Sequence, residues 1–551
     1  MSENRAQEIT SKLWAMANEL RGNMAADEYR NYILGFMFYR YLSENQLDHL
    51  RKSDLLTGNT FEELNKDYLE QAVGDELQDF LMAIAEDLGY AIEPEYTWQS
   101  ITDKVNNNTL KPEDFQEMFN RFNDNTKINT NAEQDFSGVF ADINLGNSRL
   151  GNNTNQRAKS LMKIVNLVDQ FEYNDESGHD ILGDVYEYLI AKFAGNSGKK
   201  AGEFYTPHQV SQVLARLATA SATDNGEPFS VYDAAMGSGS LLLTVQGELS
   251  KQLAKKIPVR FYGQELNTTT YNLARMNLMM HHVPYQNMTL SNADTLEEDW
   301  PKRKNTDGSE GPQTFDAVVM NPPYSQKWDN DDRKLKDPRF GEYGALPPRT
   351  KADYAFVLHG LYHLKDSGTM AIVLPHGVLF RGAKEGKIRQ ALIDKNRLDA
   401  VIGLPAGLFY STSIPTVILV LKKKRERKDI FFIDASKDFE KGKNQNLLRE
   451  TDIDKIVSTY LKREDVDKYA HDASLDEIKE NEYNLNIPRY VDTFEEEPPV
   501  DIKKVVAEIQ ETNKKIKELN SSILEDLNDL VGSDEQSNQE IELLKELFKN
   551  E

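Results

Sequence analysis

The residues with the clearest chemistry stand at the end of a mostly apolar run, FDAVVM, which has the composition of a buried strand. They are Asn321, Pro322, Pro323 and Tyr324. The two prolines fix the backbone and remove two amide donors, so the turn is rigid and rich in acceptors. The side-chain oxygen of Asn321 and the carbonyl group of Pro322 can hold both hydrogens of an exocyclic NH2 group, while Tyr324 offers a ring for stacking. Two prolines also occur in plain turns, but this combination favours a site that makes a weakly basic nitrogen nucleophilic.

A second candidate site lies in Phe229–Leu242, FSVYDAAMGSGSLL, where a predicted strand leads through a glycine turn into a predicted helix. Glycines let a ligand approach the backbone closely, and the start of a helix offers free N–H groups. The third glycine of the dinucleotide fingerprint is absent, because Leu242 stands in its place. Such a turn also occurs as plain packing. The residues expected to contact a ligand here are Asp233, Gly237, Ser238, Gly239 and Ser240.

Acidic residues at the ends of the next two predicted strands narrow the choice of ligand. Glu265 ends the segment FYGQEL. A carboxylate in this place, about 20 residues beyond a glycine turn, accepts hydrogen bonds from the ribose hydroxyls of an adenosyl group. Asp294, in LSNADTL, can accept from the adenine amine, although it can equally cap a following helix. The glycine turn and these carboxylates together predict an adenosyl ligand.

The two sites together predict methyl transfer from S-adenosylmethionine to a nitrogen that is not basic. Direct transfer needs mainly proximity and orientation of the reactants. The chain contains no cysteine, which excludes methylation at C5 of cytosine because that reaction needs a cysteine nucleophile. A base in duplex DNA has to be flipped out of the helix to reach such a site. No metal is expected, since the sequence lacks a cluster of histidines and carboxylates with ligand spacing.

The composition limits how such a site can reach its substrate. The 551 residues carry 65 Lys and Arg against 90 Asp and Glu, a formal net charge of -25. Bulk positive charge therefore cannot bind nucleic acid, and any basic surface must be local or supplied by a partner. The lack of cysteine, of a signal pattern and of a run of about 18 apolar residues indicates a cytoplasmic protein without membrane contact.

The elements that position these residues alternate between strands and helices. Short runs rich in β-branched and aromatic residues, among them VRFYGQEL, TMAIVLP and TVILVLKK, predict a parallel sheet covered on both faces. We expect a doubly wound, Rossmann-like α/β methyltransferase domain over residues 166–480, with ligands at the carboxyl ends of its strands. Residues 1–165 carry apolar side chains at helical spacing and predict an all-helical domain, with a loop at Gly146–Gln156.

Residues 481–551 predict a C-terminal helical region. Its apolar residues recur every seven positions at Ile502, Ile509, Ile516, Ile523 and Leu530. Such a helix can dock on its own domain or be presented to another subunit, with Asn513 and Asn520 as polar breaks that set the register. The pattern leaves both interpretations open.

Two stretches are candidates for contact with a phosphate backbone. KKKRERK, at Lys422–Lys428, follows a strand and is most simply a solvated strand end, with phosphate contact as the alternative. Trp328–Tyr343 mixes basic and acidic residues after the Asn321 turn. It can either order around DNA or be a mobile loop.

These motifs resemble those of the methyltransferase subunit of type I restriction-modification systems, a family of N6-adenine DNA methyltransferases. The segments that carry the resemblance span nearly the whole chain: LWAMANELRGNM, FMFYRYLSE, GDVYEYLIAKFA, AGEFYTPHQV, DAAMGSGSLL, NPPY and VIGLPAGLFYSTSIPTVILVL. One departure is that Ala234 and Met236 replace the proline and cysteine of DPACGSG-like turns, a place where cofactor affinity can differ.

The resemblance implies further contacts and partners. The segment GEFYTPHQV is expected to close over the methionine end of S-adenosylmethionine through Glu203, Phe204, Tyr205, Thr206, Pro207 and His208. Family members pair two copies with one specificity subunit, which reads the target in double-stranded DNA, and a restriction subunit joins the full complex. The expected partners are therefore a specificity subunit, a second copy of this chain and a restriction subunit.

Two other functions stay open on the residues alone. A protein-glutamine N-methyltransferase also uses an NPPY turn to hold an amide NH2 group, although the extra helical domain argues against it. A non-catalytic scaffold would keep the fold for assembly, although the intact Asn321, Tyr324 and glycine turn argue against that.

Overall fold

The computed structural model divides into two compact units, Met1–Asp492 and Thr493–Glu551. The residues it describes are 2–20, 24, 26–173, 181–196, 206–255, 257–409, 413–442, 445–493 and 502–549. None of the helices within these ranges is long and apolar enough to cross a membrane.

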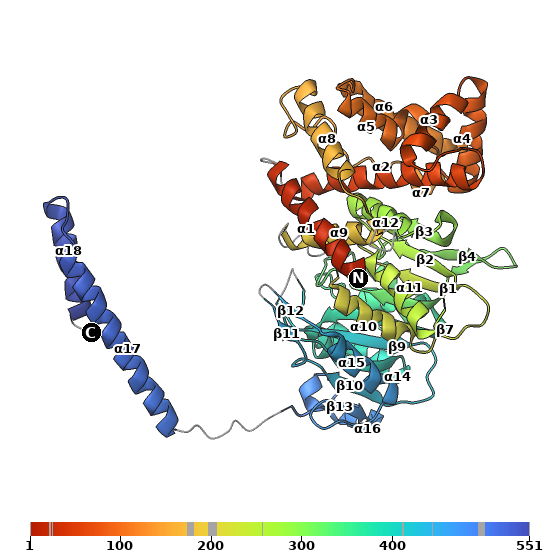
Figure 1. Ribbon diagram of the computed structural model, residues 1–551. Helices are drawn as coiled ribbons and strands as arrows, with labels where there is room; N and C mark the ends of the chain where they lie inside the picture. Colours follow the sequence, from red (N-terminus) through yellow and green to blue (C-terminus); the bar gives the residue numbers. More distant parts are fainter. Residues whose placement is uncertain are drawn as a thin grey trace. The chain divides into compact units, whose positions relative to one another are not determined.

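A sheet of nine strands forms the centre of the described part of the first unit, in the order β13-β10-β8-β9-β7-β6-β1-β2-β3 (Figure 1). Its strands are β1 (Phe229–Asp233), β2 (Val259–Gln264), β3 (Met288–Ser291), β6 (Phe315–Met320), β7 (Leu364–Pro375), β8 (Leu398–Gly403), β9 (Thr416–Lys422), β10 (Ile430–Asp434) and β13 (Ala470–Ala473). Strands β3, β2, β1, β6 and β7 are parallel to one another, and β8 is parallel to β10. The predicted doubly wound α/β fold is confirmed.

Two strands depart from the parallel arrangement. β9 lies between β7 and β8 and is antiparallel to both, and β13 is antiparallel to β10. The expectation that TVILVLKK runs parallel to its neighbours is therefore wrong. β9 follows β8 without an intervening helix in the described residues, and a chain that turns straight back pairs antiparallel. Two small hairpins complete the strands: β4 (Lys302–Lys304) with β5 (Glu310–Pro312), and β11 (Glu440–Lys441) with β12 (Asn446–Leu447).

Each face of the sheet has its own hydrophobic core, because successive strand residues point to opposite faces. Val231 and Val319 belong to one core, and their neighbours Tyr232 and Val318 belong to the other. The first face is covered by α10 (His208–Thr219), α11 (Ser240–Gln252), α12 (Thr268–Met280) and α15 (Glu450–Lys462). The second is covered by α13 (Asp353–Tyr362), α14 (Ala383–Asp394) and α16 (Leu475–Glu480).

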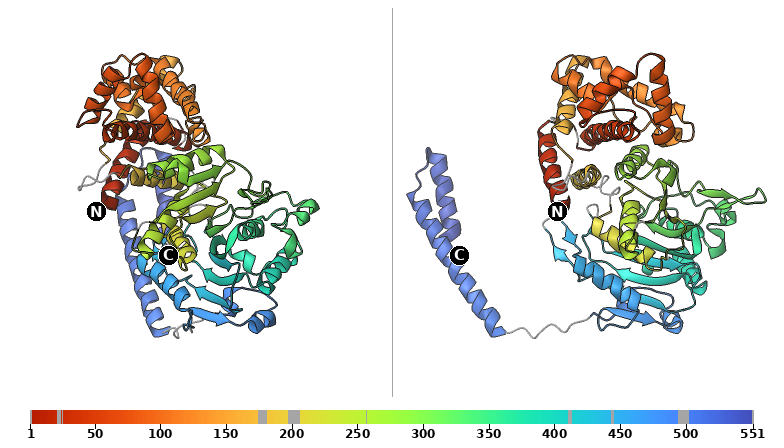
Figure 2. Two further views of the ribbon diagram at one scale, coloured as in Figure 1. Left: turned by 90° about the vertical axis from the view of Figure 1, so that its right-hand side faces the viewer. Right: turned by 45° about the vertical axis from the view of Figure 1, so that its right-hand side comes forward.

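The N-terminal part of the first unit is helical, as predicted, and its helices α2–α8 form a group of their own beside the sheet (Figures 1 and 2). The loop predicted at Gly146–Gln156 ends earlier, since α8 begins at Thr154 and Asn153 caps it by accepting the Gln156 N–H group at 2.9 Å. The helices are α1 (Ser2–Leu20), α2 (Ala26–Lys52), α3 (Phe61–Gln71), α4 (Asp75–Leu88), α5 (Trp98–Asn106), α6 (Pro112–Asn125), α7 (Glu133–Phe136), α8 (Thr154–Asp169) and α9 (Leu182–Asn196).

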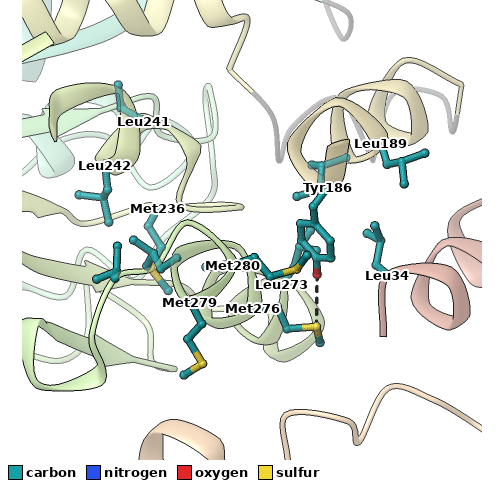
Figure 3. Close-up of a cluster of buried hydrophobic side chains, with 14 of the residues drawn as sticks. Leu34, Tyr186, Leu189, Met236, Leu241, Leu242, Leu273, Met276, Met279 and Met280 are labelled. Atoms are coloured by element: carbon teal, nitrogen blue, oxygen red, sulfur yellow. Dashed lines mark hydrogen bonds between the residues drawn. The ribbon is translucent and has the colours of Figure 1, made fainter. Parts of the chain in front are cut away.

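One hydrophobic core joins these helices to the sheet. Leu34 of α2, Tyr186 of α9 and Met276 of α12 are buried in it, and the Tyr186 hydroxyl donates to the Met276 sulfur at 3.2 Å (Figure 3). Helix α9 packs on α1, α2 and α12. Helical packing therefore continues past residue 165, the predicted limit of the N-terminal domain, and holds the side of the sheet that carries β2 and β3.

The C-terminal region begins later than residue 481. Leu485 and Ile487 are buried in the second core, and the Tyr490 ring stacks on Phe432 with ring centroids 4.0 Å apart, so the first unit continues to Asp492. The second unit holds α17 (Ile502–Asp529) and α18 (Glu535–Lys549), which pack on each other. Four residues of the predicted seven-residue repeat lie on α17 and the fifth, Leu530, directly follows it; all of them except Ile523 are exposed.

Candidate active site

A pocket of about 520 Å³ opens at the carboxyl ends of β1, β2 and β6, where a doubly wound sheet binds its ligands. Segments that are far apart in the sequence meet there. Five of the predicted site residues line this pocket: Gly237, Glu265, Asp294, Asn321 and Pro323. The structure thus brings the glycine turn, both carboxylates and the Asn321 turn to one cavity.

The glycine turn owes its shape to two residues in left-handed conformation. Gly237 has a φ of 54° and Gly239 a φ of 76°, values that favour glycine. Gly239 caps the start of α11. Ser238 and Ser240 are buried, with their hydroxyl oxygens 3.1 Å apart, and lie outside the pocket lining. These two serines therefore hold the turn together, while Gly237 faces the cavity.

Two carboxyl groups, those of Asp233 and Glu265, brace the glycine turn. Asp233, at the end of β1, is buried and accepts the Ala235 N–H group at 2.9 Å, so it braces the turn and does not line the cavity. Glu265 accepts from the Gly237 amide at 3.2 Å and from the Asn267 amide at 2.8 Å. Burial, with a contribution from the nearby Glu265 charge, raises the pKa of Asp233 to about 8. Burial also raises the pKa of Glu265.

Asp294 lines the pocket, and a turn follows it where the sequence suggests a helix. Its carboxylate accepts the Leu296 N–H group at 2.9 Å, which caps the turn that follows, and the residue also lines the pocket. Nearby, the Asn292 amide donates to the carbonyl groups of Glu265 and Leu266 at 2.8 and 3.0 Å. This bond fixes the loop after β2 to the loop after β3, so the two carboxylates keep their separation.

The Asn321 amide makes two hydrogen bonds to side chains. Its Nδ2 donates to the Thr206 hydroxyl at 3.0 Å, and its Oδ1 accepts from the Tyr324 hydroxyl at 2.8 Å. The Tyr324 ring meets Phe409 edge-on, with centroids 6.0 Å apart, and burial raises the pKa of Tyr324 well above its usual value. Pro322 is buried beneath the turn.

The segment predicted to close over the cofactor is described only in part. Glu203, Phe204 and Tyr205 lie outside the described residues. Pro207 caps α10, and its carbonyl group accepts the N–H groups of Val210 and Ser211. His208, the first residue of α10, is exposed. Of this segment, Thr206 is the described residue whose side chain reaches the Asn321 turn.

Several residues that line the pocket were not predicted from the sequence. They are Ala235, Gln264, Leu266, Asn267, Thr268, Thr295 and Gln326. Leu266 is the most informative of them about the ligand, because this large apolar side chain lines the pocket and is 57% exposed. An apolar residue directly after a strand-end carboxylate is the signal that could have found it, since a planar adenine needs an apolar face beside its polar contacts.

Each of the two basic stretches has an arginine whose side chain is buried and hydrogen-bonded within the folded chain. Arg339, in the segment after the Asn321 turn, is 2% exposed and donates to the carbonyl groups of Thr295 at 2.8 Å and Glu298 at 3.2 Å. This packing of Arg339 does not fit a mobile loop, whereas contact of Trp328–Tyr343 with DNA stays a prediction, since Arg333 in the same segment is exposed. In Lys422–Lys428, Arg425 donates to Asp399 at 2.9 Å, so the stretch is a paired strand end.

The sheet order, the glycine turn after β1 and the NPPY turn after β6 define a Rossmann-like methyltransferase. Comparison with known proteins gives the family. Residues 177–498 match the family model described as N-6 DNA Methylase, and residues 9–168 match the HsdM N-terminal domain. The chain belongs to the N-6 DNA methylase family, among the methylase subunits of type I restriction enzymes.

Individual relatives agree with this membership over nearly the full length. The MpnII methylase subunit of Mycoplasma pneumoniae is 38% identical, over 95% of this chain and 96% of the relative. The MjaVII methylase subunit of Methanocaldococcus jannaschii is 30% identical, over 89% of this chain and 80% of the relative. The crystal structure of a type I restriction-modification methyltransferase subunit from Streptococcus thermophilus superposes with a TM-score of 0.80 at 43% identity, covering 88% of this chain and 99% of that one.

Proposed function

We propose that this chain transfers a methyl group from S-adenosylmethionine to the N6 amine of adenine in DNA. The observation that carries the proposal is that Asn321 lines the same cavity as Gly237 and Glu265. An acceptor suited to an NH2 group thereby stands beside residues suited to an adenosyl group. Membership of the N-6 DNA methylase family supports the same reaction.

The pocket residues fit the proposed cofactor. Glu265 carries carboxylate lone pairs for the ribose hydroxyls, and Asp294 carries an acceptor for the adenine amine. Gly237 lets the ligand approach the backbone, while Leu266 and Phe356 offer apolar surface to the adenine ring. When bound, S-adenosylmethionine supplies a methyl group on a positively charged sulfur, which keeps the bonding electrons as the amine nitrogen attacks.

The Asn321 turn binds and orients the target amine in the proposed reaction. Asn321 Oδ1 and the Pro322 carbonyl oxygen accept its two N–H groups, which directs the nitrogen lone pair away from them. As the nitrogen becomes positively charged in the transition state, both acceptors bind it more strongly, and one proton then leaves to water. In this proposal, the flipped adenine stacks on the Tyr324 ring.

The net charge of this chain and its second unit support the proposed assembly with other subunits. At a net charge of -25 this chain has little attraction for DNA, so we propose that a specificity subunit supplies most phosphate contacts and reads the target. A second copy of this chain and a restriction subunit complete the proposed complex. The second unit, with exposed apolar residues such as Ile509 and Leu519 on α17, is the proposed subunit contact.

The test is methyl transfer from labelled S-adenosylmethionine to genomic DNA that lacks the modification. This chain is assayed alone and with its candidate specificity subunit, and the DNA is digested to nucleosides. N6-methyladenine that appears only with the partner is the expected result. Label in protein amide instead of DNA would favour a glutamine methyltransferase, and cofactor binding without any transfer would favour a scaffold.

A further inference from the structure

The side chains of Thr206, Asn321 and Tyr324 form one chain of hydrogen bonds. Thr206 precedes α10, whereas Asn321 follows β6, and 115 positions separate them. Thr206 Oγ1 accepts from Asn321 Nδ2 at 3.0 Å, and the Tyr324 hydroxyl donates to Asn321 Oδ1 at 2.8 Å. The segment implied to cover the cofactor thus contacts the proposed amine acceptor itself.

This chain of bonds has one consistent direction. An asparagine amide has a donor end and an acceptor end, and only the acceptor end can bind an incoming NH2 group. Tyr324 is partly buried, and Asn321 Oδ1 is the hydrogen-bond acceptor of its hydroxyl in the described structure. If the amide turned over, two donors would face each other at Tyr324 or its proton would lose its acceptor, which costs free energy.

Thr206 completes this arrangement at the other end of the amide. Its hydroxyl oxygen accepts one Nδ2 hydrogen and so holds the donor end of the amide in place, while the Tyr324 proton keeps the Oδ1 end on its own side. That side is also where the target base stacks in the proposed reaction. Asn321 Oδ1 has two lone pairs, so it can keep the Tyr324 hydroxyl on one and accept the target amine on the other.

We propose that Thr206 is a positioning residue for methyl transfer, which holds the Asn321 amide with its oxygen towards the target base. This inference rests on the proposed function, and it gives Thr206 a role distinct from cofactor contact. A cofactor ligand would act on cofactor affinity, whereas a positioning residue acts on the rate at saturating cofactor and DNA.

Two substitutions separate these roles. Thr206→Val keeps the shape and removes the hydroxyl, while Thr206→Ser keeps the hydroxyl. With the complex of this chain and its specificity subunit, we expect Thr206→Val to lower kcat by about 10- to 100-fold and to leave the cofactor Kd within about twofold. Thr206→Ser should restore most of kcat. Weaker cofactor binding at unchanged kcat would overturn the proposal, as would equal activity of both variants and wild type.

Crystal structures of the two variants test the positioning without any activity. We expect the Asn321 amide to turn or shift in Thr206→Val and to keep its place in Thr206→Ser, with similar unfolding midpoints for both. An unmoved Asn321 in Thr206→Val would overturn the inference. If the wild-type complex methylates no DNA, the proposed function fails, and these structures still decide whether Thr206 holds Asn321.

Discussion

The substitution Asn321→Ala removes both hydrogen bonds of this amide, one to Thr206 and one from Tyr324. The first loss costs about 1 kcal/mol, and the second leaves the partly buried Tyr324 hydroxyl without its acceptor at about 1–3 kcal/mol. The free energy of unfolding should therefore fall by about 2–4 kcal/mol, which a folded domain of this size can tolerate. Methyl transfer should fall by about 100- to 1000-fold, the usual cost of one group that stabilises transition-state charge.

Cofactor binding should survive this substitution, because the ribose and glycine contacts come from β1 and β2. Urea unfolding, calorimetric cofactor titration and initial rates on unmodified DNA measure the three effects. Glu265→Gln is the matched control at the opposite wall, where we expect cofactor affinity to fall at least about tenfold with a small change in the rate at saturation. If Asn321→Ala loses cofactor affinity while its unfolding curve stays intact, the division of roles between the two walls is wrong.

Three further predictions concern the turn, a buried carboxyl and the packed loop. Gly237→Ala and Gly239→Ala should each lower the unfolding free energy by about 1–2 kcal/mol, because both force alanine into left-handed backbone. Calorimetric titration should find weaker cofactor binding only for Gly237→Ala, because Gly237 lines the pocket and Gly239 does not. Burial raises the pKa of Asp233 from 3.8 to about 8, so between these pH values the folded state keeps a proton that the unfolded chain has lost. The unfolding free energy should therefore decrease as pH rises from about 4 to about 8. In urea titrations, Asp233→Asn should remove that slope. Arg339→Met should lower the unfolding free energy by about 3–5 kcal/mol, because Arg339 is buried. Arg333→Met, at an exposed site in the same segment, is the control and should change it by less than about 0.5 kcal/mol. Equal losses in the two variants would contradict the buried role of Arg339.

The strands of the sheet are predictable because their apolar runs, such as Val417–Leu421, are buried on both faces. Their direction is not predictable for the same reason. β9 has the composition of a parallel strand, yet it is antiparallel to β7 and β8. Direction depends on the connection that precedes a strand, and the segment between β8 and β9 carries no clear pattern for either a helix or a turn.

The site residues on the pocket wall are predictable because Gly237, Glu265 and Asn321 each follow a strand, and the carboxyl ends of parallel strands meet at one edge. Contacts between distant side chains leave no local pattern. The bond from Asn321 to Thr206 joins residues 115 positions apart and appears only in the folded chain. Asp233 illustrates a second limit, since a carboxylate at a strand end has the same sequence pattern whether it faces a ligand or its own turn.

The basic stretch Lys422–Lys428 shows why local charge is a poor guide to DNA contact in so acidic a chain. Arg425 donates to the buried Asp399 at 2.9 Å, and Arg427 donates to Asp472 at 2.6 Å. A cation that is paired in this way has to give up its carboxylate before it can bind a phosphate, so the exchange gains little. The stretch therefore stabilises the end of β9 and its neighbours. Under the proposed function, the attraction that brings DNA to the Asn321 pocket has to come mainly from other subunits, because this chain has a net charge of -25. The proposed specificity subunit is therefore a physical requirement for DNA binding.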